Sequence, residues 1–497
     1  MQLVFSKAKD QSQTFSVDGV FFHSSYSPAK EADRFIQNIN FTFTPDFIFL
    51  IEPGLSYTNE VLKKKFPQCK TICIRLFDQL LGDESFWDYC IKYSDCNNLK
   101  SYLINNFGEE KLLSSTIIIS KSAENLFNNQ INLIIEQYKN ALEEAKTLLV
   151  TRQFFEKKWL LNSCNYLKYA RNFCQPHISS KQPVVICASG PSLQNSIAVI
   201  KENFEKCFVI CLSSATSVLL NNNIIPDLIL TTDGGWWAGE HLKSLKVHKE
   251  IPIAAPCEAF IPKVILKNNP LLTLQYNDSS SFISTQILEQ AGLQTFNALR
   301  NPTVSGTALF LAKAITDNKI FFCGLDLAGG KGQQHTKPNE IEKDNLIKDN
   351  RLKNTESRIA YSRYNTQSLG IYRDWFCEQK DLDSVYRVID FDKCKQAPLG
   401  QIKDISSEAF RKEIEKFEPA KKINLANLSK AQSVNIKQCF DFICQKLLTS
   451  QWQKQIFPAD FLAIKNCNDE NQKEKLEDRL NSKIQKLILT IRKIADE

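Results

Sequence analysis

A short apolar run that passes directly into a turn of small residues constrains the fold of this chain more than any other feature. Residues 184–187 read Val-Val-Ile-Cys, which predicts a buried parallel strand, and a helical pattern begins at Leu193. The turn between them is expected to leave backbone amides unbonded at the start of a helix, where phosphate groups bind. A nucleotide-binding turn is one interpretation, and an ordinary strand-to-helix connection is the other. The candidate phosphate-binding residues are Ser189, Gly190, Pro191 and Ser192.

Two further apolar runs end in a similar way. Residues 224–235 end in Asp233 and two glycines, and residues 319–330 end in Gly324, Leu325 and Asp326 before two more glycines. In a doubly wound parallel sheet, the carboxyl ends of such strands open on one edge, where ligands bind. Asp233 and Asp326 are therefore candidates to bind a donor or a metal, although either is equally typical of a helix cap or a turn.

Hydrophobic patterning divides the chain into four regions. Residues 1–140 alternate short β-branched runs with helical stretches, which predicts a Rossmann-like α/β domain, and residues 141–177 predict a helical connector. Residues 178–398 predict a doubly wound α/β central domain. Residues 399–497 show no clear strand and predict a helical domain. Its last helix carries an apolar stripe that predicts packing within a bundle, made of Leu480, Ile484, Leu487, Ile491 and Ile494.

Composition favours a large globular enzyme of the cytoplasm. The chain has 497 residues, of which 43% are hydrophobic and 24% are charged, which is average for globular proteins. It shows neither a signal peptide nor a long apolar run, so we expect a cytoplasmic protein with no membrane partner. The 16 cysteines include no Cys-x2-Cys pair, which argues against a zinc ribbon. The net charge of +7 is spread along the chain, which favours a small anionic ligand over nucleic acid.

A long polar segment follows the third strand and extends from Lys331 to about Tyr364. A polar loop at the carboxyl edge of a sheet is typical of an active-site lid, whereas a solvated insertion without a role is the alternative. Residues near its return are candidates to contact a sugar or its carboxylate, for which the guanidinium fork is well suited. These are Tyr361, Arg363, Tyr364 and Arg373.

Several of these motifs resemble those of the motility accessory factor (Maf) proteins, which are flagellin glycosyltransferases. The resemblance lies in Ser-Gly-Pro-Ser-Leu from Ser189, the strand that ends at Asp233, Ser305-Gly306-Thr307 at a helix start, and Gly324-Leu-Asp-Leu-Ala. It covers roughly residues 15–400. The central domain of that family is similar to hydroxymethylpterin pyrophosphokinase-like (MptE-like) proteins and to bacterial CMP-sialyltransferases.

The resemblance implies transfer of a nonulosonic acid, of the pseudaminic or legionaminic type, from a CMP-sugar to Ser or Thr of flagellin. It implies that no metal cofactor is required. His335 is then the general base, with His241 a weaker candidate, because a base with a pKa near 7 suits that role. The donor-binding set extends to Ser213, Ser305, Gly306, Thr307 and Gly324, and includes Asp233 and Asp326. The turn departs from the sialyltransferase pattern, since Ala188-Ser189 replaces Gly-Asn.

Two other function classes remain open on the sequence. One is a pyrophosphokinase-like enzyme that uses ATP and magnesium, with Asp233 and Asp326 as metal ligands. No Gly-x4-Gly-Lys-Ser/Thr loop marks ATP in this chain. The other is a flagellar chaperone or scaffold without catalytic activity, which the altered turn and Ser213 allow.

Overall fold

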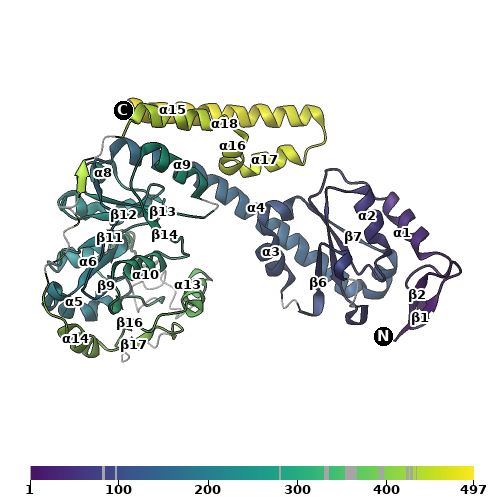
Figure 1. Ribbon diagram of the computed structural model, residues 1–497, viewed down its shortest axis with the longest axis horizontal. Coiled ribbons are helices and arrows are strands. Elements are labelled where there is room, and N and C mark those ends of the chain that lie inside the picture. Colours follow the sequence, from purple (N-terminus) through teal and green to yellow (C-terminus); the bar gives the residue numbers. More distant parts are fainter. Residues whose placement is uncertain are drawn as a thin grey trace. The chain divides into compact units, whose positions relative to one another are not determined.

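The computed structural model describes residues 2–80, 84–95, 98–278, 281–328, 335–352, 367–390, 397–420, 422, 425, 429–431 and 434–497. These residues fall into two compact units (Figure 1). The N-terminal unit consists of Met1–Glu156 and Leu448–Lys486. The central unit consists of Lys157–Leu447 and Leu487–Glu497. The division into four regions drawn from the sequence stays a prediction.

The N-terminal unit is built on a parallel sheet in the order β6-β5-β4-β7, as expected for a Rossmann-like domain. All five residues of β4 are buried, because both faces of the sheet are covered. Ile48 and Leu50 pack with the helices α1 and α2, whereas Phe49 packs with α4. The strands are β4 (Phe47–Ile51), β5 (Lys70–Arg75), β6 (Tyr89–Lys92) and β7 (Ser115–Ile119), and the helices are α1 (Pro28–Gln37), α2 (Tyr57–Lys65) and α3 (Leu99–Leu113). A separate antiparallel sheet comprises β1 (Leu3–Lys7), β2 (Gln13–Val17) and β3 (Val20–Phe21).

The helical pattern after the first domain forms α4 (Lys121–Tyr169), which is kinked by non-helical backbone at Phe127 and contributes to both units. One face of this helix is apolar and buried, and it includes Ile131, Ile134, Tyr138 and Ala145. Leu133, by contrast, is half exposed.

The central unit contains a doubly wound sheet in the order β17-β16-β15-β9-β10-β11-β12-β13-β8-β18, with β14 paired to β13. Every pairing is parallel except that of β18 with β8. The chain adds β10 to β13 on one side of β9 and then returns to place β15 on its other side. The strands are β8 (Asn172–Cys174), β9 (Val184–Cys187), β10 (Phe208–Leu212), β11 (Leu228–Leu230), β12 (Ile253–Pro256), β13 (Leu271–Tyr276), β14 (Phe296–Ala298), β15 (Ile320–Cys323), β16 (Val385–Val388), β17 (Lys403–Ile405) and β18 (Ser429–Ala431).

Helices cover this sheet, and its strands form a continuous apolar core. Val184, Ile186, Phe208, Ile210 and Phe322 are each fully buried, which explains why these strands read as unbroken apolar runs. The helices between strands are α5 (Leu193–Glu202), α6 (Thr216–Asn221), α7 (Trp236–His241), α8 (Lys263–Asn268), α9 (Phe282–Ala291), α10 (Val304–Ile315), α11 (Glu340–Ile347), α13 (Gln367–Glu378) and α14 (Ser407–Glu415).

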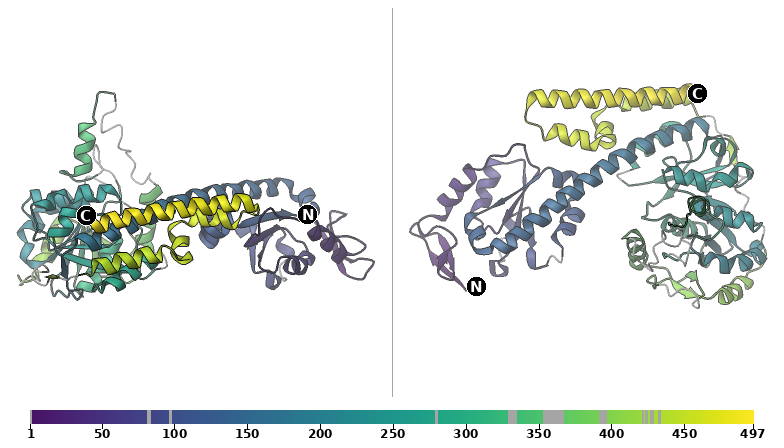
Figure 2. Two further views of the ribbon diagram at one scale, coloured as in Figure 1. Left: turned by 90° about the horizontal axis from the view of Figure 1, so that it is seen from above. Right: turned by 180° about the vertical axis from the view of Figure 1, so that it is seen from behind.

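The C-terminal region is mainly helical, as predicted, but it also contributes β17 and β18 to the central sheet. These strands are three residues long and mostly polar, so hydropathy gives no sign of them. The helices are α15 (Ile436–Lys446), α16 (Ser450–Ile456), α17 (Pro458–Lys465) and α18 (Glu470–Asp496). The stripe on α18 is confirmed, because Leu480, Ile484, Leu487 and Ile491 are buried. The C-terminal end of α18 lies beside α15 in every view (Figures 1 and 2).

Candidate functional site

The ends of β9 and β15 and the start of α10 converge on one pocket of about 230 Å³ in the central unit. The pocket lies where the strand order reverses, between β9 and β15, and this is the crevice where open α/β sheets bind ligands. Six residues predicted from the sequence line it: Ser189, Gly190, Ser305, Gly324, Asp326 and His335. The structure therefore brings together residues from four separate segments of the chain.

The turn after β9 is bonded within the protein, contrary to the expectation of unbonded amides. The Gly190 N–H donates to the Gly324 carbonyl at 2.9 Å. The Ser192 N–H donates to Asp326 Oδ2 at 2.8 Å. Pro191 has no N–H to offer. The start of α5 is thus satisfied by a carboxylate from a distant strand, so this turn serves mainly to join β9 to β15.

Asp326 is the central group of this junction. It is buried, with 4% of its surface exposed, and it also accepts a hydrogen bond from Ser192 Oγ. A negative charge at this point is stabilised by the positive end of the α5 dipole. Gly190 permits the contact, because a Cβ atom there would lie 2.5 Å from the Gly324 oxygen and 2.7 Å from Asp326 Oδ2. The Asp326 carboxylate therefore caps the N-terminus of α5. A helix cap is one of the two roles that the sequence allows for this residue.

The start of α10 supplies hydroxyl groups to the pocket. Thr303 caps the helix, with its side chain accepting the Ser305 N–H at 3.4 Å, and Thr303, Val304 and Ser305 all line the pocket. Opposite them, Ser214 Oγ donates to Ser189 Oγ at 2.9 Å. A helix start with hydroxyl groups around it attracts an anion, because first-turn N–H groups and the helix dipole both favour negative charge. The N–H groups of Ser305, Gly306 and Thr307 are bonded to Thr303, so the hydroxyl groups of Thr303 and Ser305 are the candidate anion contacts at this end of the pocket.

Two buried residues hold His335 at the pocket. The N–H of Thr336 donates to the Ser189 carbonyl at 2.8 Å, and its hydroxyl donates to the Gly190 carbonyl. Asn339 donates from Nδ2 to the Ser214 carbonyl at 2.8 Å. Thr336 and Asn339 are 2% and 1% exposed, so both ends of this short segment are fixed. His335 is therefore a pocket residue held by the same turns that form the pocket.

Asp233 and His241 form a separate group at the end of β11. Asp233 Oδ1 accepts the Gly235 N–H at 2.8 Å, which is the turn role left open by the sequence. Burial, helped by the nearby His335, lowers the pKa of His241 to about 4, so this imidazole is neutral at pH 7. Neither residue lines the pocket between β9 and β15.

Other predicted residues lie outside the pocket lining. Gly306 serves packing, because a Cβ atom there would lie 2.9 Å from the Trp375 ring. Arg373 on α13 pairs with Asp374. The remaining residues that do not line the pocket are Pro191, Ser192, Ser213 and Thr307. The predictions for Tyr361, Arg363 and Tyr364 lie outside the described residues.

Sequence reasoning did not assign a role to three polar residues that line the pocket, Thr303, Ser214 and Tyr372. Thr303 carries a usable signal, since a threonine just before an apolar-periodic segment is a helix cap. The sequence also gave no sign of a cluster of charged residues at the ends of β12, β13 and β14. There Arg300 pairs with Glu258 at 2.9 Å and with Asp278 at 3.1 Å, and its guanidinium lies 4.5 Å from the Tyr276 ring centre.

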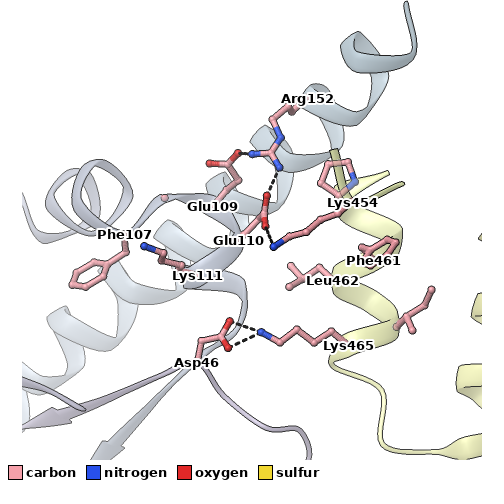
Figure 3. Close-up of a pocket in the computed structure, with 13 residues that line it drawn as sticks. Asp46, Phe107, Glu109, Glu110, Lys111, Arg152, Lys454, Phe461, Leu462 and Lys465 are labelled. Carbon is pink, nitrogen blue, oxygen red and sulfur yellow. Dashed lines mark hydrogen bonds and ion pairs between the residues drawn. The ribbon is translucent and has the colours of Figure 1, made fainter. Parts of the chain in front are cut away.

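A larger pocket, of about 800 Å³, lies within the N-terminal unit (Figure 3). Its rim is closed by ion pairs: Arg152 with Glu109 and Glu110, and Lys465 with Asp46 at 2.5 Å. The pair of Lys465 connects α17 to the α/β part of the unit, and Lys454 of α16 pairs with Glu110 at 3.8 Å. No residue predicted to be functional lines this pocket.

No group of three or more His, Cys, Asp or Glu residues in the described ranges is placed to hold a metal ion. Within the same ranges, every helix is too short or too polar to cross a membrane.

Comparison with known proteins gives three findings. Residues 157–332 match the family described as 6-hydroxymethylpterin diphosphokinase MptE-like. An uncharacterized protein of Treponema pallidum (strain Nichols) is 27% identical over 316 residues, which is 63% of this chain and 68% of that protein. The structure of a Maf glycosyltransferase from Magnetospirillum magneticum AMB-1 superposes with a TM-score of 0.54 at 12% identity. It covers 100% of this chain and 93% of that one. The resemblance to Maf proteins with an MptE-like central domain is thereby confirmed, and so is the α/β fold class.

Proposed function

Because the chain has the fold of a Maf glycosyltransferase around an MptE-like domain, we propose that it is a protein glycosyltransferase. In this proposal it transfers a nonulosonic acid of the pseudaminic or legionaminic type from a CMP-sugar to a serine or threonine hydroxyl of flagellin. The donor phosphate binds at the start of α10, and no metal ion is required.

One observation carries this proposal: a hydroxyl-rich helix start and a histidine face the same pocket at the switch point of the sheet. The hydroxyl groups of Thr303 and Ser305 can donate hydrogen bonds to a phosphate. His335 lines the same pocket. An enzyme that transfers a sugar needs both an anion site for the leaving nucleotide and a base for the acceptor. The pocket therefore contains the minimum set of groups for the reaction.

The reaction is a direct displacement at the anomeric carbon. His335 takes the proton of the acceptor hydroxyl, whose oxygen forms the new bond to the anomeric carbon. The bond from that carbon to the phosphate oxygen breaks, and CMP leaves with the electron pair. Donors at the start of α10 stabilise the charge that develops on the phosphate.

The proposal is tested by incubating the purified chain with flagellin from the same organism and a CMP-nonulosonic acid. Release of CMP and a matching increase in flagellin mass are expected. Ser305→Ala should raise the KM for the donor, and His335→Ala should lower kcat. His177→Ala is the matched control, because His177 is an exposed histidine of the same unit that does not line the pocket. Absence of a mass change with every donor and acceptor tested would contradict the proposal.

A second candidate function is a magnesium-dependent diphosphokinase, which the MptE-like match favours. Thermal-shift measurements separate the two, because a ligand that binds only the folded protein raises its melting temperature. Stabilisation by CMP and CDP without metal supports the glycosyltransferase. Stabilisation by ATP only when magnesium is present supports the diphosphokinase.

A further inference from the structure

We propose that Arg300 is a positioning residue that fixes the first turn of α10, so that the hydroxyl groups of Thr303 and Ser305 can meet the phosphate of a bound nucleotide. The proposal rests on the proposed function, because it concerns the same pocket. Arg300 itself does not line this pocket, and its guanidinium is bonded to acidic side chains. It therefore acts through the segment that follows it and not by touching the substrate.

The guanidinium of Arg300 joins the ends of three neighbouring strands. Glu258, Asp278 and Arg300 follow β12, β13 and β14 (Figure 1). Arg300 Nη2 donates to Glu258 Oε2 at 2.9 Å, and Nε donates to Asp278 Oδ2 at 3.1 Å. Nη2 also donates to Ser281 Oγ at 2.9 Å. A planar guanidinium bonds several groups at once in a fixed geometry, so these contacts restrain its position in more than one direction.

The partners of Arg300 are themselves held by the protein. Glu258 is buried, and its Oε1 accepts a hydrogen bond from Ser284 Oγ on α9 at 2.7 Å. Asp278 Oδ1 accepts the N–H of Ser281, the residue before α9, at 2.9 Å. The guanidinium is therefore attached to groups that the sheet and α9 keep in place.

Other contacts hold the segment between β14 and α10 only weakly. β14 is three residues long and, among the described strands, it pairs with β13 alone. Leu299 is half exposed and Pro302 is exposed, so burial of apolar side chains does not anchor this segment. Pro302 also has no N–H to donate. The position of these residues therefore depends largely on Arg300.

The same segment is coupled directly to the first turn of α10. Asn301 Nδ2 donates to Thr307 Oγ1 at 3.4 Å, and a Cβ atom added to Gly306 would lie 2.9 Å from Asn301 Cβ. A displacement of this segment would therefore also move Thr303 and Ser305, which line the pocket. Groups that bind a ligand must be held within about 0.5 Å of their working positions, so a small displacement is sufficient to weaken binding.

The test measures the binding of CMP and of cytidine to the full chain by NMR titration. Arg300→Lys keeps the positive charge but lacks the planar fork, so it cannot hold both carboxylates in the same geometry. We expect this variant to weaken CMP binding about fivefold and to leave cytidine binding unchanged, because only CMP carries a phosphate. Unchanged CMP affinity, or an equal loss for both ligands, would overturn the proposal.

A double-mutant cycle with Ser305→Ala shows whether Arg300 acts through the hydroxyl groups of the pocket. If it does, the two changes remove partly the same interaction. The loss of CMP affinity in the double variant should then be at least about threefold smaller than the product of the single losses. Multiplicative losses would refute the proposal while leaving the proposed function intact. A wild-type chain that does not bind CMP would contradict the proposed function, and this proposal with it.

A matched control separates positioning from general stability. Arg387 is a buried arginine of the same unit that donates two hydrogen bonds to Asp404, both at 2.7 Å, and it does not line the pocket. Arg387→Lys should lower the urea midpoint at least as much as Arg300→Lys but leave CMP affinity unchanged. An equal loss of CMP affinity in both variants would reduce the effect to destabilisation and refute the proposal.

A second variant keeps the proposal testable if Arg300→Lys does not fold. Asp278→Asn removes the charge of one partner at a position that is 35% exposed, so the unit should tolerate it. It should weaken CMP binding about threefold without affecting cytidine, because one charge-assisted hydrogen bond to Arg300 becomes a neutral one. Unchanged CMP affinity in the folded Asp278→Asn variant would count against Arg300 as the anchor of α10.

Discussion

Replacement of Asp326 by asparagine tests whether this carboxylate holds the central pocket together. The change keeps the shape of the side chain and removes its charge. In the structure, Asp326 is 4% exposed and accepts two hydrogen bonds from Ser192, one from the N–H at 2.8 Å and one from the hydroxyl. An asparagine keeps only one acceptor oxygen, so one of the two Ser192 donors loses its partner.

The expected loss of stability follows from these contacts. A hydrogen bond to a charged group contributes about 1.5–3 kcal/mol, against about 0.5–1.5 kcal/mol for a neutral pair. Loss of negative charge at the start of α5 costs a further ~0.3–1 kcal/mol through the helix dipole. We therefore expect Asp326→Asn to lower the free energy of unfolding of the central unit by about 2–3 kcal/mol.

The measurement is urea unfolding at constant pH, followed by a double-mutant cycle with Ser192→Ala. The cycle isolates the bond between the Ser192 hydroxyl and Asp326, because Ser192→Ala leaves the backbone N–H in place. A coupling of about 1 kcal/mol is expected. An Asp326→Asn variant within about 0.5 kcal/mol of the wild type, or purely additive effects, would refute the assignment of Asp326 as the cap of α5.

Further predictions concern the turn, the metal, the base and the pH dependence. Gly190→Ala should destabilise the central unit and reduce soluble yield, because the added Cβ atom would lie 2.5 Å from the Gly324 oxygen; a normal urea midpoint would contradict this. Glycosyl transfer should persist in EDTA, and a magnesium-reversible loss would favour the diphosphokinase. His335→Ala should lower kcat by roughly 10²–10⁴-fold with little change in donor affinity, and near-normal turnover would exclude His335 as the base. His23 and His241 have folded pKa values of about 4, below the value of about 6.5 in unfolded chains. The unfolded state then binds more protons between these values, so stability is full above about pH 6.5 and falls as the pH decreases toward 4. After a discount for partial exposure, we expect about 1–2 kcal/mol for each histidine, and glutamine variants should flatten the slope measured by urea titration.

The sequence by itself determined the α/β class and the positions of the main strands. The segments 47–51, 184–187 and 320–323 are apolar because both faces of a parallel sheet are buried. The burial of a strand can therefore be predicted from the amino acids of that strand alone. The same reasoning placed Asp326 at the carboxyl edge of the sheet, since the carboxyl ends of parallel strands share one side. Ser305 was expected at the site only from the resemblance to the Maf proteins.

Only the tertiary structure decided which groups are bonded to each other. The Ser192 amide is occupied by a carboxylate 134 residues away, and no local pattern could show this. The same holds for Thr336 and Ser189, which are joined across the pocket, and for β17 and β18, whose short polar segments pair only because a sheet edge is present. The hydropathy of each residue indicates whether it is buried. The hydrogen-bond partner of a residue depends instead on which distant segments the fold brings into contact.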